Sequence, residues 1–130
     1  MILGFKKQFV KDIMCGYNIH TIREDPKGRW QPGKKIHFAT GTRTKNYNQF
    51  KTGVCVSVQK ISICYHSSVG DMYGSPDIFI DDNLLGVGVG AYAKRELLAK
   101  NDGFYFLLDF YKWFSEDYNG KIIHWTDFRY

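Results

Sequence analysis

Alternating hydrophobic and polar positions predict that much of this chain is β-structure, because the side chains of a half-buried strand point to its two faces in turn. The strongest alternation lies between positions 54 and 65, where Val54, Val56 and Val58 are followed by Ile61 and Ile63. The valines occupy even positions and the isoleucines odd ones. A bend or bulge near positions 59 and 60 would therefore keep both groups on one inward face. The predicted strands span 2–5, 19–24, 35–40, 54–65, 78–80 and 121–130.

Helical spacing replaces this alternation in shorter segments. Phe9, Ile13 and Met14 form the apolar stripe of the first segment, which Gly16 ends. An aromatic stripe marks the last segment, and we expect that stripe to face the core. The predicted helices span 6–15, 92–100 and 104–118.

These elements predict one α+β domain over residues 1–130, with the polar segment 41–50 as a long exposed loop. Five or six strands, with helices before the second strand and ahead of the last, fit a small, partly closed β-barrel. The helices would be packed at one side of the barrel, over one of its openings.

Composition supports a folded, cytoplasmic protein. Hydrophobic residues make up 44% and aromatic residues 17% of the 130 positions, which excludes a disordered chain. No apolar run approaches the roughly 18 residues of a membrane span, and the first seven residues are too short for a signal peptide. We therefore expect no membrane association.

The charge, the cysteines and the histidines indicate which partners, disulfides and metal sites to expect. The formal net charge is +5, with the cations gathered in the first half of the chain, which favours a polyanionic partner such as RNA. Cys15, Cys55 and Cys64 have no CxxC spacing and apolar neighbours, so buried free thiols are expected rather than a disulfide framework or a zinc site. The histidines show no metal-ligand spacing, and the sequence predicts neither a metal nor a cofactor.

The most distinctive segment is 16–23, which places an amide, an imidazole, a hydroxyl and a guanidinium within six residues. If a strand begins near position 19, Thr21 and Arg23 share one face while His20 and Ile22 share the other. A threonine and an arginine side by side can hold a phosphate or a carbonyl oxygen. The alternative is a half-buried edge strand with a solvated arginine.

Segment 16–23 resembles the Gly-x-Lys-x-x-Thr-Ile-Arg motif of the ASCH family, small domains of the PUA-like superfamily. Gly16, Thr21, Ile22 and Arg23 match this motif, and Asn18 stands in place of its lysine. Further segments resemble later motifs of the family in the same order. These segments are 29–38, a Pro-Gly turn entering a barrel strand; 101–104, an acidic-Gly-Phe motif; and 120–125, the closing strand.

The resemblance implies a cleft between barrel and helices, and in members that hydrolyse acetylated cytidine it implies catalytic residues. Carried over, Thr21 fits the nucleophile and Asp102 fits the acid. A threonine needs an adjacent base, and the amide of Asn18 cannot act as one. His20 would point away from Thr21, so a 4-acetylcytidine amidohydrolase or a ribonuclease remains an alternative rather than the first hypothesis.

The first hypothesis is a nucleic-acid or nucleotide-binding module that takes RNA or a modified nucleoside. Its ligand-binding residues would be Asn18, Thr21, Arg23, Trp30 and Asp102, with Trp30 stacking on a base. Trp30 could instead be a core anchor, and Asp102 a helix N-cap. A protein-interaction module with an aromatic-rich surface is the third hypothesis, and the oligomeric state is left open.

Overall fold

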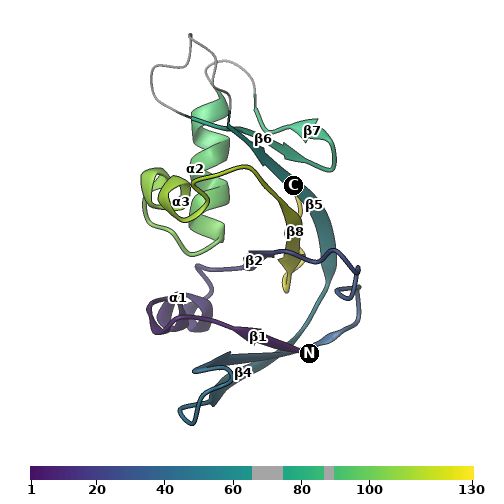
Figure 1. The fold of residues 1–130 in the computed structure, drawn as a ribbon, viewed down its shortest axis with the longest axis vertical. Coiled ribbons are helices and arrows are strands. Elements are labelled where there is room, and N and C mark those ends of the chain that lie inside the picture. The colour runs from purple at the N-terminus through teal and green to yellow at the C-terminus, as the bar shows by residue number, and fades with distance from the viewer. Residues whose placement is uncertain (66–74, 87–89) are drawn as a thin grey trace.

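The computed structural model describes residues 1–65, 75–86 and 90–130, and Figure 1 shows their arrangement. The strands are β1 (Ile2–Gly4), β2 (His20–Arg23), β3 (Lys35–Thr40), β4 (Asn48–Val54), β5 (Ser57–Cys64), β6 (Asp77–Ile80), β7 (Asn83–Leu84) and β8 (Tyr118–His124). The helices are the 3-10 turn η1 (Lys7–Phe9), α1 (Val10–Cys15), α2 (Ala91–Asn101) and α3 (Leu107–Trp113). The strand predicted at 35–40 is confirmed at both ends.

The strands form two sheets, with the orders β1-β3-β4 and β2-β8-β5-β6-β7. Only β1 and β3 pair in parallel among the described strands; the other pairs are antiparallel. Two residues, Cys55 and Val56, separate β4 from β5, so nearly one continuous strand passes from the first sheet to the second. The α+β class is therefore confirmed, but strand pairing in the described residues does not close the sheets into a barrel.

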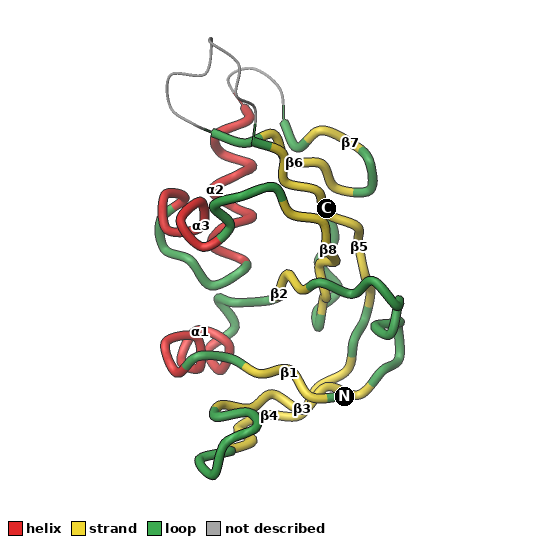
Figure 2. The backbone as a smooth tube through the Cα atoms, viewed as in Figure 1, coloured by secondary structure: helices red, strands yellow, loops and turns green. Residues whose placement is uncertain are grey.

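The helices lie on one side of the strands, as the tube in Figure 2 shows. The chain turns at Gly16, which ends α1 in the left-handed conformation at φ 87°. A glycine suits this position because a side chain would add strain there. After this turn the Asn18 backbone N–H donates to the Asp12 carbonyl of α1, and the chain continues into β2.

The core lies between the helices and the sheets, and it includes Trp30, of which 7% is exposed. The inward positions around β5 are odd-numbered throughout: Cys55, Gln59, Ile61 and Ile63 are buried. The prediction of an inward Val54 and Val56 with a bulge near position 59 is wrong, since both valines are exposed. Gln59 can take an inward place because both ends of its side-chain amide are hydrogen-bonded.

Three other predictions need correction. Strand β4 occupies the end of the predicted loop 41–50, and α3 is shorter than the predicted helix 104–118. Of the three cysteines, Cys55 alone is buried; Cys15 is exposed and Cys64 half-buried.

In the described ranges, no helix has the length and apolar character needed to cross a bilayer.

Candidate functional site

Strand β2 places two candidate residues on the wall of a cleft of about 820 Å³. Thr21 lies opposite Ile123 of β8 and Arg23 opposite Lys121, so their side chains project from the same face of β2. The Arg23 Nε donates a hydrogen bond of 3.1 Å to the Thr21 hydroxyl. The predicted pairing of Thr21 and Arg23 on one face is confirmed.

The Arg23 guanidinium is held by further contacts. Its Nη2 donates to the Gly4 carbonyl at 2.6 Å, and its central carbon lies 4.9 Å from the centre of the Phe5 ring. Burial lowers the pKa of Arg23, while the Asp102 carboxyl and the Tyr118 phenol oppose that shift. No partner for Nη1 is found within the described residues, which leaves this N–H group free to bind a ligand.

Asn18 lines the cleft between α1 and β2, with only 1% of the residue exposed. Its backbone N–H donates to the Asp12 carbonyl, and its side-chain Oδ1 has no hydrogen-bond partner within the described residues. The Asn18 side-chain amide fits here because residue 103 is a glycine, which has no side chain. A Cβ at position 103 would lie 2.5 Å from Asn18 Nδ2 and 2.7 Å from the Phe9 ring.

Asp102 follows α2 as its C-cap, and its backbone N–H donates to the Leu98 carbonyl. The alternative prediction of a helix N-cap is therefore wrong. Asp102 lines the cleft with Asn18 and Thr21 although only 8% of the residue is exposed. Burial raises the pKa of the Asp102 carboxyl well above its ordinary value, while Arg23 and the Ile22 backbone N–H oppose the shift.

His20 lies on the opposite face of β2 and contacts Asp102 from behind. Its Nδ1 is 3.1 Å from Asp102 Oδ1, and its Nε2 is 2.7 Å from the Tyr130 hydroxyl. Burial lowers the pKa of His20 to about 3, so the imidazole is neutral at pH 7. Sequence analysis predicted that His20 points away from Thr21, but it missed both of these partners.

A second set of buried polar groups adjoins His20 in the interior. Gln59 Oε1 accepts from His124 Nε2 at 3.0 Å and from the Tyr130 backbone N–H at 2.9 Å. Gln59 Nε2 donates to Asp81 Oδ2 at 2.8 Å and to the Tyr130 carbonyl at 2.9 Å. Gln59 was not predicted as a buried residue; the one sign of it in the sequence is its odd position between the apolar residues Cys55 and Ile61.

Aromatic rings form the apolar walls of the cleft. Trp113 is 47% exposed, and the Lys6 ammonium lies 4.9 Å from the centre of its ring. Trp30, a predicted ligand residue, is not among the residues that line the cleft. The other aromatic residues that line it are Phe5, Phe9, Phe104, Phe114 and Tyr118.

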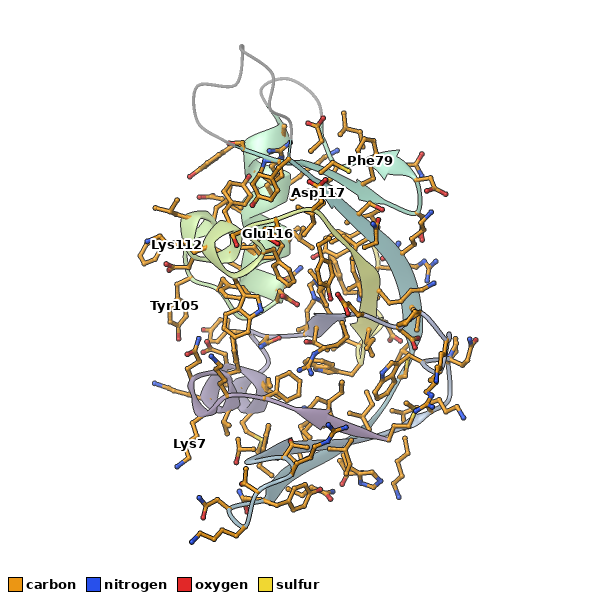
Figure 3. The ribbon with its side chains drawn as sticks, in the orientation of Figure 1. Lys7, Phe79, Tyr105, Lys112, Glu116 and Asp117 are labelled. Atoms are coloured by element: carbon orange, nitrogen blue, oxygen red, sulfur yellow. The ribbon has the colours of Figure 1, made fainter. Side chains whose placement is uncertain are left out.

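The charged residues of the cleft are more acidic than the chain as a whole. The cations that line it are Lys6 and Arg23, and the carboxylates are Glu24, Asp102, Glu116 and Asp117. Figure 3 shows Glu116 and Asp117 in the segment between α3 and β8, while Tyr105 and Lys112 point away from the sheets. The cleft is therefore poorly suited to a polyphosphate.

Nucleophilic catalysis would require a base beside Thr21. The group that contacts its hydroxyl is the Arg23 guanidinium, which remains protonated and cannot accept the proton. Among the described residues, no cluster of three or more His, Cys, Asp or Glu side chains could hold a metal ion. The arrangement is thus suited to hydrogen bonding and stacking.

No protein-family model, curated protein or solved structure matches this chain. Any functional assignment therefore depends on the residues and geometry of the cleft.

Proposed function

We propose that this chain is an ASCH-like module of the PUA-like type that binds a nucleobase, from RNA or a modified nucleoside, in the cleft beside β2. The proposal includes a barrel-like relation between the two sheets and a cytoplasmic setting, which suits free cysteines. The observation that carries it is the joint presence of a fixed donor, Arg23, and a buried acceptor, Asp102, in one aromatic-walled cleft.

The donor and the acceptor match the edge of a base. Arg23 Nη1 is available to a carbonyl oxygen, and its position is set by bonds to Gly4 and Thr21. Asp102 can accept from an exocyclic amino group, because a carboxylate has capacity beyond its bonds to His20 and Ile22. The flat surface of a base can stack on the exposed ring of Trp113.

Recognition is favoured over hydrolysis because Thr21 is bonded to a guanidinium rather than to a base. The excess of carboxylates around the cleft also favours contact with the base over contact with phosphate. Binding of a nucleoside should therefore change little with salt, whereas a phosphate-driven interaction would weaken steeply.

Titration with cytidine and with a short single-stranded RNA, followed by tryptophan fluorescence, tests the proposal. We expect Arg23→Gln and Asp102→Asn to weaken cytidine binding by about tenfold to a hundredfold, as expected for a lost charge-assisted hydrogen bond. Arg29→Gln is the matched control, because Arg29 is an exposed cation that does not line the cleft.

Two results would contradict the proposal. One is the absence of binding to either ligand; the other is an equal loss of affinity in Arg29→Gln. Turnover of 4-acetylcytidine that is abolished by Thr21→Ala would favour the hydrolase alternative instead.

A further inference from the structure

Four side chains form a continuous hydrogen-bonded chain behind the cleft. Asn101 Nδ2 lies 3.1 Å from the Tyr130 hydroxyl, which lies 2.7 Å from His20 Nε2; His20 Nδ1 lies 3.1 Å from Asp102 Oδ1. His20 is fully buried, and Asn101 and Asp102 are at most 9% exposed. Only the last of the four, Asp102, also lines the cleft.

The donors along this chain fix the direction of its hydrogens. With the Asn101 amide nitrogen facing the phenol, the Tyr130 oxygen accepts and must direct its own hydrogen elsewhere. The neighbouring acceptor is His20 Nε2, which therefore carries no hydrogen. A neutral imidazole then has its single hydrogen on Nδ1, directed at Asp102 Oδ1.

We infer that Asn101, Tyr130 and His20 are positioning residues that hold an N–H donor on the buried oxygen of Asp102, so that the cleft presents an ionised acceptor and selects ligands with an amino group. This inference rests on the proposed function, because it states what the cleft recognises. It differs from that proposal in naming residues that never contact the ligand.

The reverse orientation is disfavoured by two unsatisfied groups. If His20 carried its hydrogen on Nε2, the Tyr130 hydroxyl would receive two donors and its own hydrogen would face no acceptor in the described structure. His20 Nδ1 would also face Asp102 Oδ1 with a lone pair, so that only a protonated carboxyl could bond to it. Buried groups are rarely left without partners.

The other groups around Asp102 and His20 act on the ionisation of Asp102 in opposite directions. Burial raises the pKa of Asp102, and Arg23 together with the Ile22 N–H opposes the shift; the Tyr118 and Tyr130 phenols carry no charge near pH 7. On the other side of His20, the His124 ring lies 5.2 Å away and is also neutral, because its own pKa is lowered to about 3. The donor from His20 therefore contributes to whether Asp102 is ionised at pH 7.

Nitrogen NMR of the assigned His20 ring tests the orientation without any ligand. At pH 7 we expect a protonated Nδ1 and an unprotonated Nε2 in the wild-type protein. We expect the hydrogen to stay on Nδ1 in Tyr130→Phe, because Asp102 Oδ1 still accepts it and Nε2 then faces no polar partner in the described structure. A wild-type ring with its hydrogen on Nε2 would overturn the inference.

Ligand binding by His20→Phe tests the consequence, because this variant removes the N–H donor that faces Asp102 Oδ1. We expect cytidine affinity at pH 7 to fall about tenfold, because a neutral carboxyl is a weaker acceptor than a carboxylate. We also expect the preference for cytidine over uridine, which has a carbonyl oxygen in place of the amino group, to narrow. Since binding requires ionised Asp102 and the variant raises its pKa, binding should be lost at a higher pH as the solution is acidified.

Tyr65→Phe is the control for losing a side-chain hydrogen bond elsewhere, because it removes a phenol that bonds to the Tyr111 and Phe114 carbonyls outside this chain of side chains. Its cytidine affinity and pH profile should match the wild type. Unchanged affinity and selectivity in His20→Phe would overturn the inference. If wild-type protein does not bind cytidine at all, the proposed function fails, while the NMR measurement still decides the orientation of His20.

Discussion

Two buried amide side chains, Gln59 in the interior set and Asn18 in the cleft set, differ in how completely they are bonded. In the interior set around Gln59, both amide atoms of that residue make two hydrogen bonds each. In the cleft set, Asn18 Oδ1 has no partner in the described structure, and Arg23 leaves one nitrogen free. Both sets include residues that are almost fully buried, so burial alone does not separate them.

The difference indicates which polar groups serve stability and which are available to a ligand. A fully bonded buried amide such as that of Gln59 stabilises the fold, and much stability is lost when it is removed. An unsaturated one costs stability in the free protein, because its groups have given up water without a replacement. Substitution in the interior set should therefore lower stability more than ligand binding. Substitution in the cleft set should lower ligand binding more than stability.

Gln59→Leu should have the largest effect on stability. The leucine fills a similar space but leaves groups of His124, Asp81 and Tyr130 without their partner, so we expect a loss of about 4 kcal/mol in the free energy of unfolding. Urea denaturation measures the loss. Gln49→Leu, at an exposed position on β4, should cost less than about 0.5 kcal/mol, and a similar cost in both variants would contradict the comparison.

Gly103→Ala should follow, with a loss of about 3 kcal/mol. The residue has φ 95°, and the new Cβ would meet Asn18 and Phe9 at 2.5 and 2.7 Å, so backbone strain and crowding add together. Gly33→Ala separates the two causes, since Gly33 has φ 93° but a Cβ added there would meet no atom within 4 Å. We expect that control to cost about 1 to 2 kcal/mol by denaturation; an equal loss at both sites would rule out crowding at the cleft.

His124→Gln should change how stability depends on pH. The pKa of His124 is lowered from 6.5 to about 3, so between these values the unfolded chain binds a proton that the folded protein does not. Stability should therefore fall as pH drops through this window, and the variant should reduce that slope by about 1.4 kcal/mol per pH unit.

Urea denaturation at several pH values between about 7 and 4 measures this slope. His20 contributes in the same direction, while the raised pKa of Asp102 acts in the opposite one, and both remain in the variant. Parallel curves for His124→Gln and the wild type would show that His124 titrates normally in the folded protein.

Asn18→Leu should have the smallest effect on stability. Because Asn18 Oδ1 makes no hydrogen bond in the described structure, its removal should change the free energy of unfolding by less than about 1 kcal/mol. The same variant should weaken cytidine binding measurably. A loss as large as that of Gln59→Leu would mean that the Asn18 amide is a structural group.

The sequence was informative where function depends on neighbouring positions. Alternation alone placed Thr21 and Arg23 on one face of β2, and a motif resemblance led to Asp102, which lies in the same cleft. The bounds of β3 were also predicted correctly, because its hydrophobic alternation is regular.

Contacts between distant segments could not be predicted in this way. His20 meets Asp102 across 82 positions and Tyr130 across 110, distances over which local periodicity carries no information. Position 59 was predicted only as the place of a bend or bulge, yet the partners of Gln59 come from three other segments. Trp30 was expected at the ligand because of its basic neighbours, but its ring lies in the core.

The pairing of β2 with β8 has a consequence for how the protein is made. His20 pairs with His124, so β2 has no partner strand until about 100 further residues have left the ribosome. Contacts of such long range fold slowly, because the intervening chain must first be ordered. The cleft should therefore form late in folding, after the β3–β4 hairpin, and newly made chains should acquire ligand binding only once β8 has been synthesised.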